Sequence, residues 1–261
     1  MNILDTIIIA KRKEVAEKKV SKTIGELENG PFFKNKTLSF AKFLLRDDRT
    51  GIIAEFKRQS PSKGVINHSS TVEDVTTAYT KYGASGISVL TDREFFGGSL
   101  EDLLAATVNE VPLLRKDFIV DEYQLIESKA FGAEIILLIA ACLTTEEVKS
   151  LAAVAKNIGL NVLLEIHNDE ELNHICDDVD VVGINNRDLK TFNVDINRSI
   201  ELGKMIPGDK VKISESGIDD VATINLLKSH GFKGFLMGEK FMKEKDPGKA
   251  FQEFVEELAT S

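Results

Sequence analysis

From Gly51 onward, short runs of aliphatic and β-branched residues alternate with amphipathic stretches. Each run is followed by a turn and then by apolar residues at helical spacing, which is the pattern of a strand followed by a helix. Runs that are apolar on both faces predict strands covered on both sides. The eight runs are residues 52–57, 87–90, 113–116, 135–139, 162–165, 181–184, 211–215 and 235–238.

Helix ends carry a shared signature. A glycine follows each of four amphipathic stretches shortly before the next run, at Gly83, Gly132, Gly159 and Gly231. Glycine is favoured there because a helix often ends on a residue with positive φ, where a Cβ atom is unfavourable. Ser99 and Thr144, each followed closely by acidic residues, are predicted to cap helix N-termini.

Eight strand–helix units in a row predict parallel strands with right-handed crossovers, closed into a (β/α)₈ TIM barrel over residues 51–261. A doubly wound open sheet is the alternative. That fold usually carries a GxGxxG fingerprint at its first strand–helix turn, and residues 55–64 lack it.

The first fifty residues follow another pattern. Apolar residues recur at helical spacing and predict an amphipathic helix: Ile3, Leu4, Ile7, Ile8 and Val15. A second short helix is predicted around residues 40–45. We expect residues 1–50 to be a helical extension packed on the barrel, so that residues 1–261 form one α/β domain.

Bulk composition fits this fold. A length of 261 residues suits one α/β barrel, which typically needs about 250. The net charge of −9 argues against nucleic-acid binding, which relies on a basic face. It leaves room for an anionic small molecule, because local lysines can make a positive pocket on an acidic protein.

Nothing in the sequence predicts a membrane or export. No stretch approaches the roughly 20 apolar residues of a membrane span. The apolar run 7–9 is too short for a signal peptide, and the basic residues 11–13 lie on its wrong side. Cys142 and Cys176 lack CxxC spacing and are expected to be reduced. We therefore expect a cytoplasmic monomer with no membrane or nucleic-acid partner.

Polar residues end most of the runs, although a strand buried between helices and a packed barrel has no packing reason to end in a charge. The residues in question are Glu55, Lys57, Lys116, Glu165, Asn185, Glu215 and Ser216. In a TIM barrel the carboxyl ends of the strands carry the catalytic groups. Residues two apart on a strand face the same way, so Glu55 and Lys57 should share the barrel mouth. A structural ion-pair network is the competing interpretation.

Glycines after the last two runs predict a phosphate site. Gly217 and Gly238, the latter followed by Glu239, would let backbone N–H groups approach an oxyanion closely. Glycines needed only for tight turns are the alternative. A metal site is not expected, because no HExxH or paired-ligand spacing joins His68, His167, His174 and His230.

Five motifs in order resemble those of indole-3-glycerol phosphate synthases. They are IAEFKRQSPS at 53–62, SVLTD at 88–92 with FFGGS at 95–99, LRKDFIVD at 114–121, GINNRDL at 183–189, and SESGI at 214–218. The resemblance covers the whole chain. It departs at Gln59, where a lysine is common in the family.

The resemblance implies ring closure of 1-(2-carboxyphenylamino)-1-deoxyribulose 5-phosphate with loss of carbon dioxide and water, and no cofactor. Lys116 corresponds to the general acid. Glu165 corresponds to an acid–base residue, with Lys57 as its partner or as a ligand for the substrate carboxylate or phosphate. Glu55 or Glu215 would stabilise positive charge on the ring nitrogen.

Substrate contacts are implied in the same way. Asn185 would orient a hydroxyl, and Ser216 belongs to the same catalytic set. Phe96 and Phe118 would sandwich the anthranilate ring, while Arg187 and Ser60 would bind the substrate. The backbone at Gly217, Gly238 and Glu239 would take the phosphate.

Two other functions remain open at this stage. One is an aldolase-type barrel in which Lys116 or Lys57 forms a Schiff base with another sugar phosphate. The other is a barrel that binds a sugar phosphate without catalysis.

Overall fold

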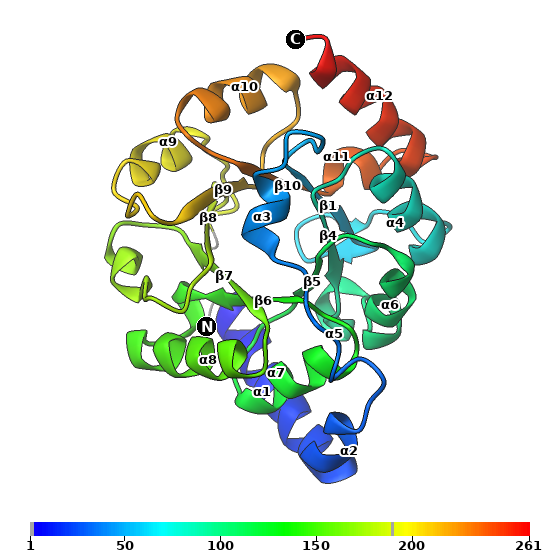
Figure 1. Ribbon diagram of the computed structural model, residues 1–261, viewed down its shortest axis with the longest axis vertical. Helices are drawn as coiled ribbons and strands as arrows, with labels where there is room; N and C mark the ends of the chain where they lie inside the picture. The colour runs from blue at the N-terminus through cyan, green and yellow to red at the C-terminus, as the bar shows by residue number, and fades with distance from the viewer. Residues whose placement is uncertain (1–2, 189–190) are drawn as a thin grey trace.

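A computed structural model describes residues 3–188 and 191–261, so Leu189 of the fourth motif lies outside the described residues. Within the described part, eight parallel strands close into a barrel in the order β1-β10-β9-β8-β7-β6-β5-β4. Helices surround it, as Figure 1 shows. The closed barrel confirms the predicted fold class and excludes the open doubly wound sheet.

The strands of the barrel are β1 (Ile52–Phe56), β4 (Gly86–Leu90), β5 (Leu113–Lys116), β6 (Ile135–Ile139), β7 (Asn161–Ile166), β8 (Val181–Asn185), β9 (Val211–Glu215) and β10 (Gly234–Met237). A two-stranded hairpin, β2 (Gln59–Ser60) with β3 (Gly64–Val65), rises from the turn after β1.

The α-helices are α1 (Ile3–Ser21), α2 (Ile24–Glu28), α3 (Phe40–Leu44), α4 (Val72–Lys81), α5 (Arg93–Phe96), α6 (Leu100–Ala105), α7 (Glu122–Ala130), α8 (Thr145–Asn157), α9 (Asn197–Gly203), α10 (Val221–Ser229), α11 (Glu239–Met242) and α12 (Pro247–Ala259). Short 3₁₀ helices are η1 (Ala106–Val108), η2 (Ala140–Cys142) and η3 (Glu170–His174).

The predicted helix boundaries are confirmed where a cap defines them. Gly83, Gly132, Gly159 and Gly231 have φ of 96°, 87°, 80° and 84°. The Ser99 and Thr144 side chains accept hydrogen bonds from the third residue of their helices. The connection after β7, residues 167–180, contains the 3₁₀ helix η3 in place of the α-helix expected there.

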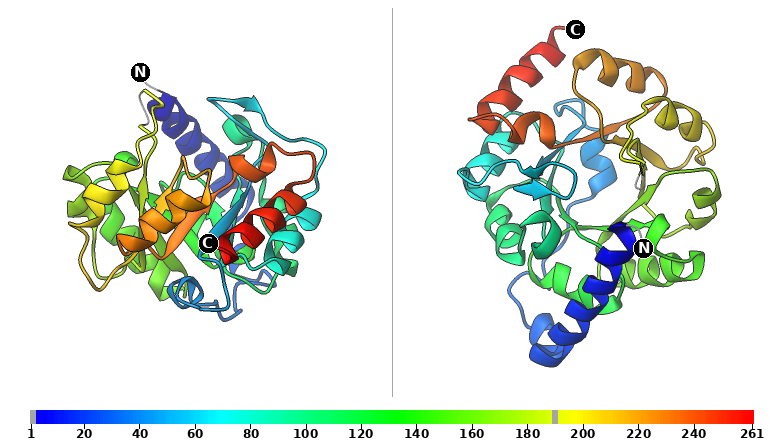
Figure 2. Two further views of the ribbon diagram at one scale, coloured as in Figure 1. Left: turned by 90° about the horizontal axis from the view of Figure 1, so that it is seen from above. Right: turned by 180° about the vertical axis from the view of Figure 1, so that it is seen from behind.

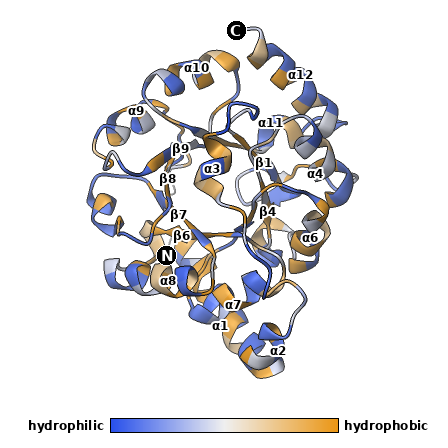
Figure 3. Cartoon of the chain, in the orientation of Figure 1, coloured by the Kyte–Doolittle hydropathy of each residue, from blue (hydrophilic) through white to orange (hydrophobic). Residues whose placement is uncertain are grey.

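Two apolar layers hold the barrel together. Ile53, Leu137, Leu163 and Ile213 belong to the cluster inside the barrel. Alternate residues of β1, β6 and β7 join the larger cluster between strands and helices. The surrounding helices mix hydrophilic and hydrophobic residues along their length, as expected for helices with one solvent-exposed face (Figure 3).

The N-terminal extension packs on the barrel at both ends. Phe40 and Leu44 of α3 join the interior cluster and close the end opposite the mouth, where Figure 1 shows α3 over the centre of the barrel. Helix α1 runs along the other side, with its N-terminal end near the mouth (Figure 2). Ile3, Leu4 and Ile7 of α1 line the cavity described below.

One buried lysine fixes α1 to the strand ends. The Lys11 ammonium, 1% exposed, lies 2.9 Å from an Asp92 carboxylate oxygen and 3.0 Å from one of Asp117. Asp92 caps α5, while Asp117 follows β5 directly and also pairs with Arg115 at 3.0 Å. Although burial opposes the charge, these carboxylates raise the pKa of Lys11.

We predict that Lys11→Met destabilises the protein by about 3–5 kcal/mol, because it leaves the buried Asp92 carboxylate without its cation. For a chain of this size that corresponds to a Tm lower by roughly 10 °C in thermal unfolding followed by circular dichroism. Lys13→Met is the matched control, since Lys13 is 80% exposed on the same helix. Equal Tm values for the two variants would contradict this role of Lys11.

Candidate active site

Four strands place a charged side chain at the mouth of the barrel, the end at which the strands finish, and they do so by the same sequence spacing. An interior aliphatic residue stands two positions before each charge: Ile53 before Glu55, Leu114 before Lys116, Leu163 before Glu165, and Ile213 before Glu215. Since residues two apart share a face, each charged side chain points along the barrel interior, one layer above its apolar core. The mouth is thus the last layer of the barrel with the apolar residues replaced by charged ones.

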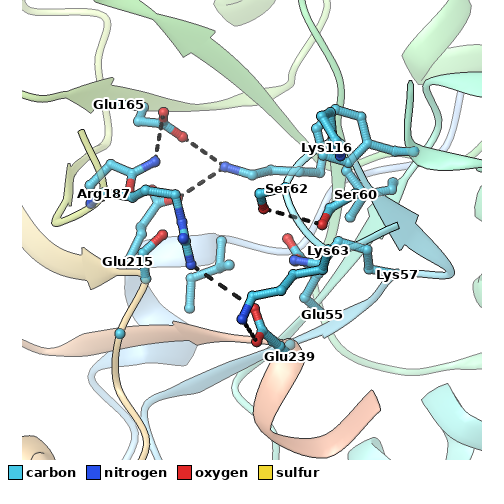
Figure 4. Close-up of a pocket in the computed structure, with 18 of the residues that line it drawn as sticks. Glu55, Lys57, Ser60, Ser62, Lys63, Lys116, Glu165, Arg187, Glu215 and Glu239 are labelled. Carbon is cyan, nitrogen blue, oxygen red and sulfur yellow. Dashed lines mark hydrogen bonds and ion pairs between the residues drawn. The ribbon is translucent and has the colours of Figure 1, made fainter. Parts of the chain in front are cut away.

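Lys116 is the centre of this layer. Its ammonium lies 2.7 Å from Oε2 of Glu165 and 3.0 Å from Oε2 of Glu215, across the pocket (Figure 4). Both carboxylates are buried, and the lysine side chain is 16% exposed. Burial opposes the charge on Lys116, but the three nearby glutamates raise its pKa, so the amine is protonated at neutral pH.

The two glutamates differ in protonation because of their surroundings. Lys116 and His167 hold the pKa of Glu165 well below its ordinary value. Burial and repulsion from Glu165 outweigh Lys116 and raise the pKa of Glu215 to about 7. A pair of carboxylates whose pKa values are pushed apart suits acid–base work, with one ionised and the other able to carry a proton.

A second ion pair occupies the β1 side of the mouth. The Lys57 ammonium lies 2.8 Å from Oε1 of Glu55, and the Ser88 hydroxyl donates to Oε2 of Glu55 at 3.4 Å. This confirms that Glu55 and Lys57 share the mouth. The side chain of Lys57 is 17% exposed, and the residue lines the cavity.

Amide and guanidinium groups complete the β8 side. The Asn185 Nδ2 donates to Oε1 of Glu165 at 3.1 Å. The Asn185 Oδ1 accepts from the backbone N–H of Arg187 at 3.0 Å, which fixes the turn after β8. The Arg187 guanidinium lies 4.0 Å from the carboxylate of Glu239, which also pairs with Lys63 of the β2–β3 turn at 3.3 Å.

Phe96 and Phe118 lie together at the cavity wall. Their ring centroids are 6.1 Å apart and the rings are tilted by 40°. A third ring inserted between them would need about 7 Å of separation, twice a carbon–carbon contact distance. The predicted sandwich therefore requires one of the phenylalanines to shift when a ligand enters.

The glycines after β9 and β10 leave no room for side chains. Gly217 has φ +71°, and a Cβ atom there would lie 2.2 Å from Val194 Cγ1. A Cβ atom on Gly238 would lie 2.8 Å from the Glu55 carboxylate. Ser216 also has positive φ, 68°, and its carbonyl accepts from Asn186 Nδ2. Ser216, Gly217 and Gly238 line the cavity where a phosphate site was expected.

One cavity of about 490 Å³, within the size range of small-molecule sites, lies among these groups. The lining includes every site residue predicted from the sequence: Glu55, Lys57, Ser60, Phe96, Lys116, Phe118, Glu165, Asn185, Arg187, Glu215, Ser216, Gly217, Gly238 and Glu239. In Figure 4 the labelled side chains converge from both halves of the barrel.

Some site residues escaped the sequence interpretation. His167 was considered only as a metal ligand, yet its Nε2 lies 3.2 Å from Oε1 of Glu165. Because residues two apart on a strand face the same way, its position two residues after Glu165 could have indicated that the two side chains lie on the same face. Lys63 and the first turns of α1 carried no such signal, since only the folded chain brings them to the mouth.

Among residues 3–188 and 191–261, no three His, Cys, Asp or Glu side chains are arranged to hold a metal ion. In the same described part of the chain, none of the helices combines the length and apolar character needed to cross a membrane.

Comparisons with known proteins point to one family. A family model described as "Indole-3-glycerol phosphate synthase" matches residues 4–254. A relative of that name from Bacteroides thetaiotaomicron is 46% identical, over 98% of this chain and 99% of its own length. Another from Alkaliphilus metalliredigens is 41% identical, over 96% and 97%.

A solved structure shows the shared fold at low sequence identity. The tryptophan synthase subunit alpha of Legionella pneumophila superposes with a TM-score of 0.61 at 14% identity, covering 85% of this chain and 97% of its own. That likeness concerns the barrel alone. The family match and the full-length relatives carry the assignment: this chain belongs to the indole-3-glycerol phosphate synthase family, carboxy-lyases of tryptophan biosynthesis that act on a small-molecule substrate.

Proposed function

We propose that the cavity at the barrel mouth closes the indole ring of 1-(2-carboxyphenylamino)-1-deoxyribulose 5-phosphate, with Lys116 as the general acid. The observation that carries this assignment is the Lys116 ammonium, held between two buried glutamates inside the cavity. Because its pKa is raised, the acid is already protonated when the substrate arrives.

Ring closure begins at the C2 carbonyl of the ribulose. Protonation of its oxygen by Lys116 makes the carbon electrophilic, and the aryl carbon that bears the carboxylate attacks it. The attack interrupts aromaticity and places positive charge on the ring nitrogen. Glu55 or Glu215 stabilises that charge as it develops. Loss of carbon dioxide then restores the aromatic ring.

Dehydration completes the indole. The ring hydroxyl departs as water after protonation, and a carbon-bound proton is removed. Glu165 suits the removal because it is ionised at neutral pH and can accept the proton. Lys57 is its partner or holds a substrate anion, while Asn185 and Ser216 orient the hydroxyl groups.

Substrate anions have several cationic and backbone partners at the mouth. Arg187 binds the substrate carboxylate, and Ser60 of β2 contributes a hydroxyl on the opposite wall. The backbone N–H groups at Gly217, Gly238 and Glu239 take the phosphate, supported by the place of these residues in the cavity lining. Phe96 and Phe118 contact the anthranilate ring.

All of the proposed site residues come from a single chain, so the site needs no second copy. We therefore propose that the protein works as a monomer. Its free cysteines, Cys142 and Cys176, are compatible with a cytoplasmic enzyme.

We predict that Lys116→Met abolishes turnover while circular dichroism shows a folded protein. Loss of one acid–base group lowers kcat by about 10²–10⁴-fold. Lys116→Arg is the matched control for charge, since an arginine keeps the ion pairs but does not release its proton. It should be nearly as inactive. Substantial turnover by either variant would refute Lys116 as the acid.

Glu165→Gln should lower kcat almost as much, because a neutral amide can hydrogen bond to Lys116 but cannot accept the proton. Asp180→Asn provides a control for loss of a carboxylate elsewhere: Asp180 pairs with Lys156 away from the cavity. Near-normal rates for Glu165→Gln in a fluorescence assay of indole formation would contradict the assigned role.

Borohydride treatment separates this mechanism from a Schiff-base aldolase. A nucleophilic lysine must be neutral, and the carboxylates around Lys116 oppose that state. We therefore expect no change in protein mass after reduction in the presence of substrate. A stable substrate adduct mapped to Lys116 or Lys57 would favour the aldolase mechanism instead.

A further inference from the structure

A histidine lies behind Glu165, on the side away from Lys116. His167 follows β7 directly and is 8% exposed. Its Nε2 lies 3.2 Å from Oε1 of Glu165, and its Nδ1 lies 3.3 Å from Oε2 of Glu171 in η3. The ring thus bridges two carboxylates, one inside the proposed site and one behind it.

Glu171 is itself held in place. Its Oε2 accepts the backbone N–H of His167 at 2.7 Å, and its Oε1 accepts the Asn168 side-chain amide at 2.8 Å. The Asn168 Oδ1 in turn accepts the backbone N–H of Glu171 at 3.1 Å. This closed set of bonds directs the Glu171 carboxylate at the imidazole, as a carboxylate behind a histidine commonly does to fix its orientation.

A ring with carboxylate oxygens beside both nitrogens is best satisfied when both nitrogens carry a proton. Burial disfavours the charged ring, yet Glu165 and Glu171 outweigh it and raise the pKa of His167 to about 9. The Nε2 contact is an ion pair without full hydrogen-bond alignment. Its effect on Glu165 is therefore chiefly that of a nearby positive charge.

Both carboxylate oxygens of Glu165 consequently have partners. Lys116 pairs with Oε2, while Asn185 and His167 lie at Oε1. Of these partners, Lys116 and His167 carry charge. Removal of His167 would leave one neutral amide at Oε1 and make the carboxylate easier to protonate.

We propose that His167, clamped by Glu171, is a positioning residue that holds the Glu165 carboxylate toward Lys116 and Asn185 and supplies it with a second counter-charge. This inference rests on the acid–base role proposed for Glu165. In this role His167 does not contact the substrate and acts only through Glu165.

Other titratable groups around the ring bear on its pH response. Cys142 of η2 lies near Glu165 and Glu171, and burial with these carboxylates raises the pKa of its thiol. Asp5 of α1 adds to the same negative surroundings. Of the groups around the ring, Glu165 and Glu171 favour its protonated form, while the positive charge of Lys116 opposes it from across Glu165.

The test compares His167→Gln and Glu171→Gln with the wild-type enzyme over a range of pH. Loss of the counter-charge should lower kcat at pH 7 on the order of 10-fold, less than loss of a direct acid–base group. It should leave KM within about two-fold, because substrate contacts are untouched. The acidic limb of the kcat profile should move to higher pH, since Glu165 then protonates more readily.

His174→Gln is the matched control, because this histidine lies on the same 3₁₀ helix as Glu171 and its ring nitrogens contact the backbone carbonyls of Glu171 and Leu143. It should leave both kcat and the pH profile near wild type. A His167→Gln enzyme that is less stable but has an unchanged pH profile would show a merely structural role and overturn the proposal.

Nitrogen NMR of histidine-labelled protein provides a readout independent of turnover. In wild-type protein both His167 ring nitrogens should stay protonated beyond pH 8, and Glu171→Gln should move the titration to lower pH. A pKa near 6.5 for the His167 ring would contradict the proposed action of Glu171 on it. If the wild-type enzyme lacked synthase activity, the proposed function would fail, whereas this titration would still decide the state of His167.

Discussion

The site depends on one buried cation shared by two carboxylates. Lys116 stands between Glu165 and Glu215, and without it these two buried glutamates would repel each other. Although burial opposes its charge, these two glutamates together with Glu55 keep the lysine protonated. This mutual dependence keeps Lys116 protonated and Glu165 ionised, and it gives Glu215 a pKa of about 7. The same arrangement disfavours the neutral amine that Schiff-base chemistry would need.

The barrel explains how residues so far apart in the chain reach this arrangement. Each of the four strands β1, β5, β7 and β9 contributes an aliphatic residue to the interior and then, two positions later, a charge at the rim. Behind that rim, Lys11 ties α1 to Asp92 and Asp117, the residue next to Lys116. The N-terminal extension therefore braces the strand ends that carry the site, in addition to covering the barrel.

Sequence reasoning was most successful where a local rule determines the outcome. Period-two parity placed Glu55 and Lys57 together, and the apolar runs with their glycine-capped helices predicted the closed barrel. It failed where only tertiary packing decides. The burial of Lys11 and the approach of Lys63 to Glu239 depend on segments that meet after folding. His167 was missed for another reason: it was weighed as a metal ligand alone, although parity with Glu165 predicted its direction.

The absence of tryptophan from the chain gives the central claim a direct test, because any indole fluorescence must come from product. Purified enzyme would be mixed with the anthranilate-derived ribulose phosphate while indole emission and carbon dioxide release are followed together. The account predicts that both appear in equal amounts. A folded enzyme that binds the substrate but produces neither would contradict it and favour a barrel that only binds a sugar phosphate.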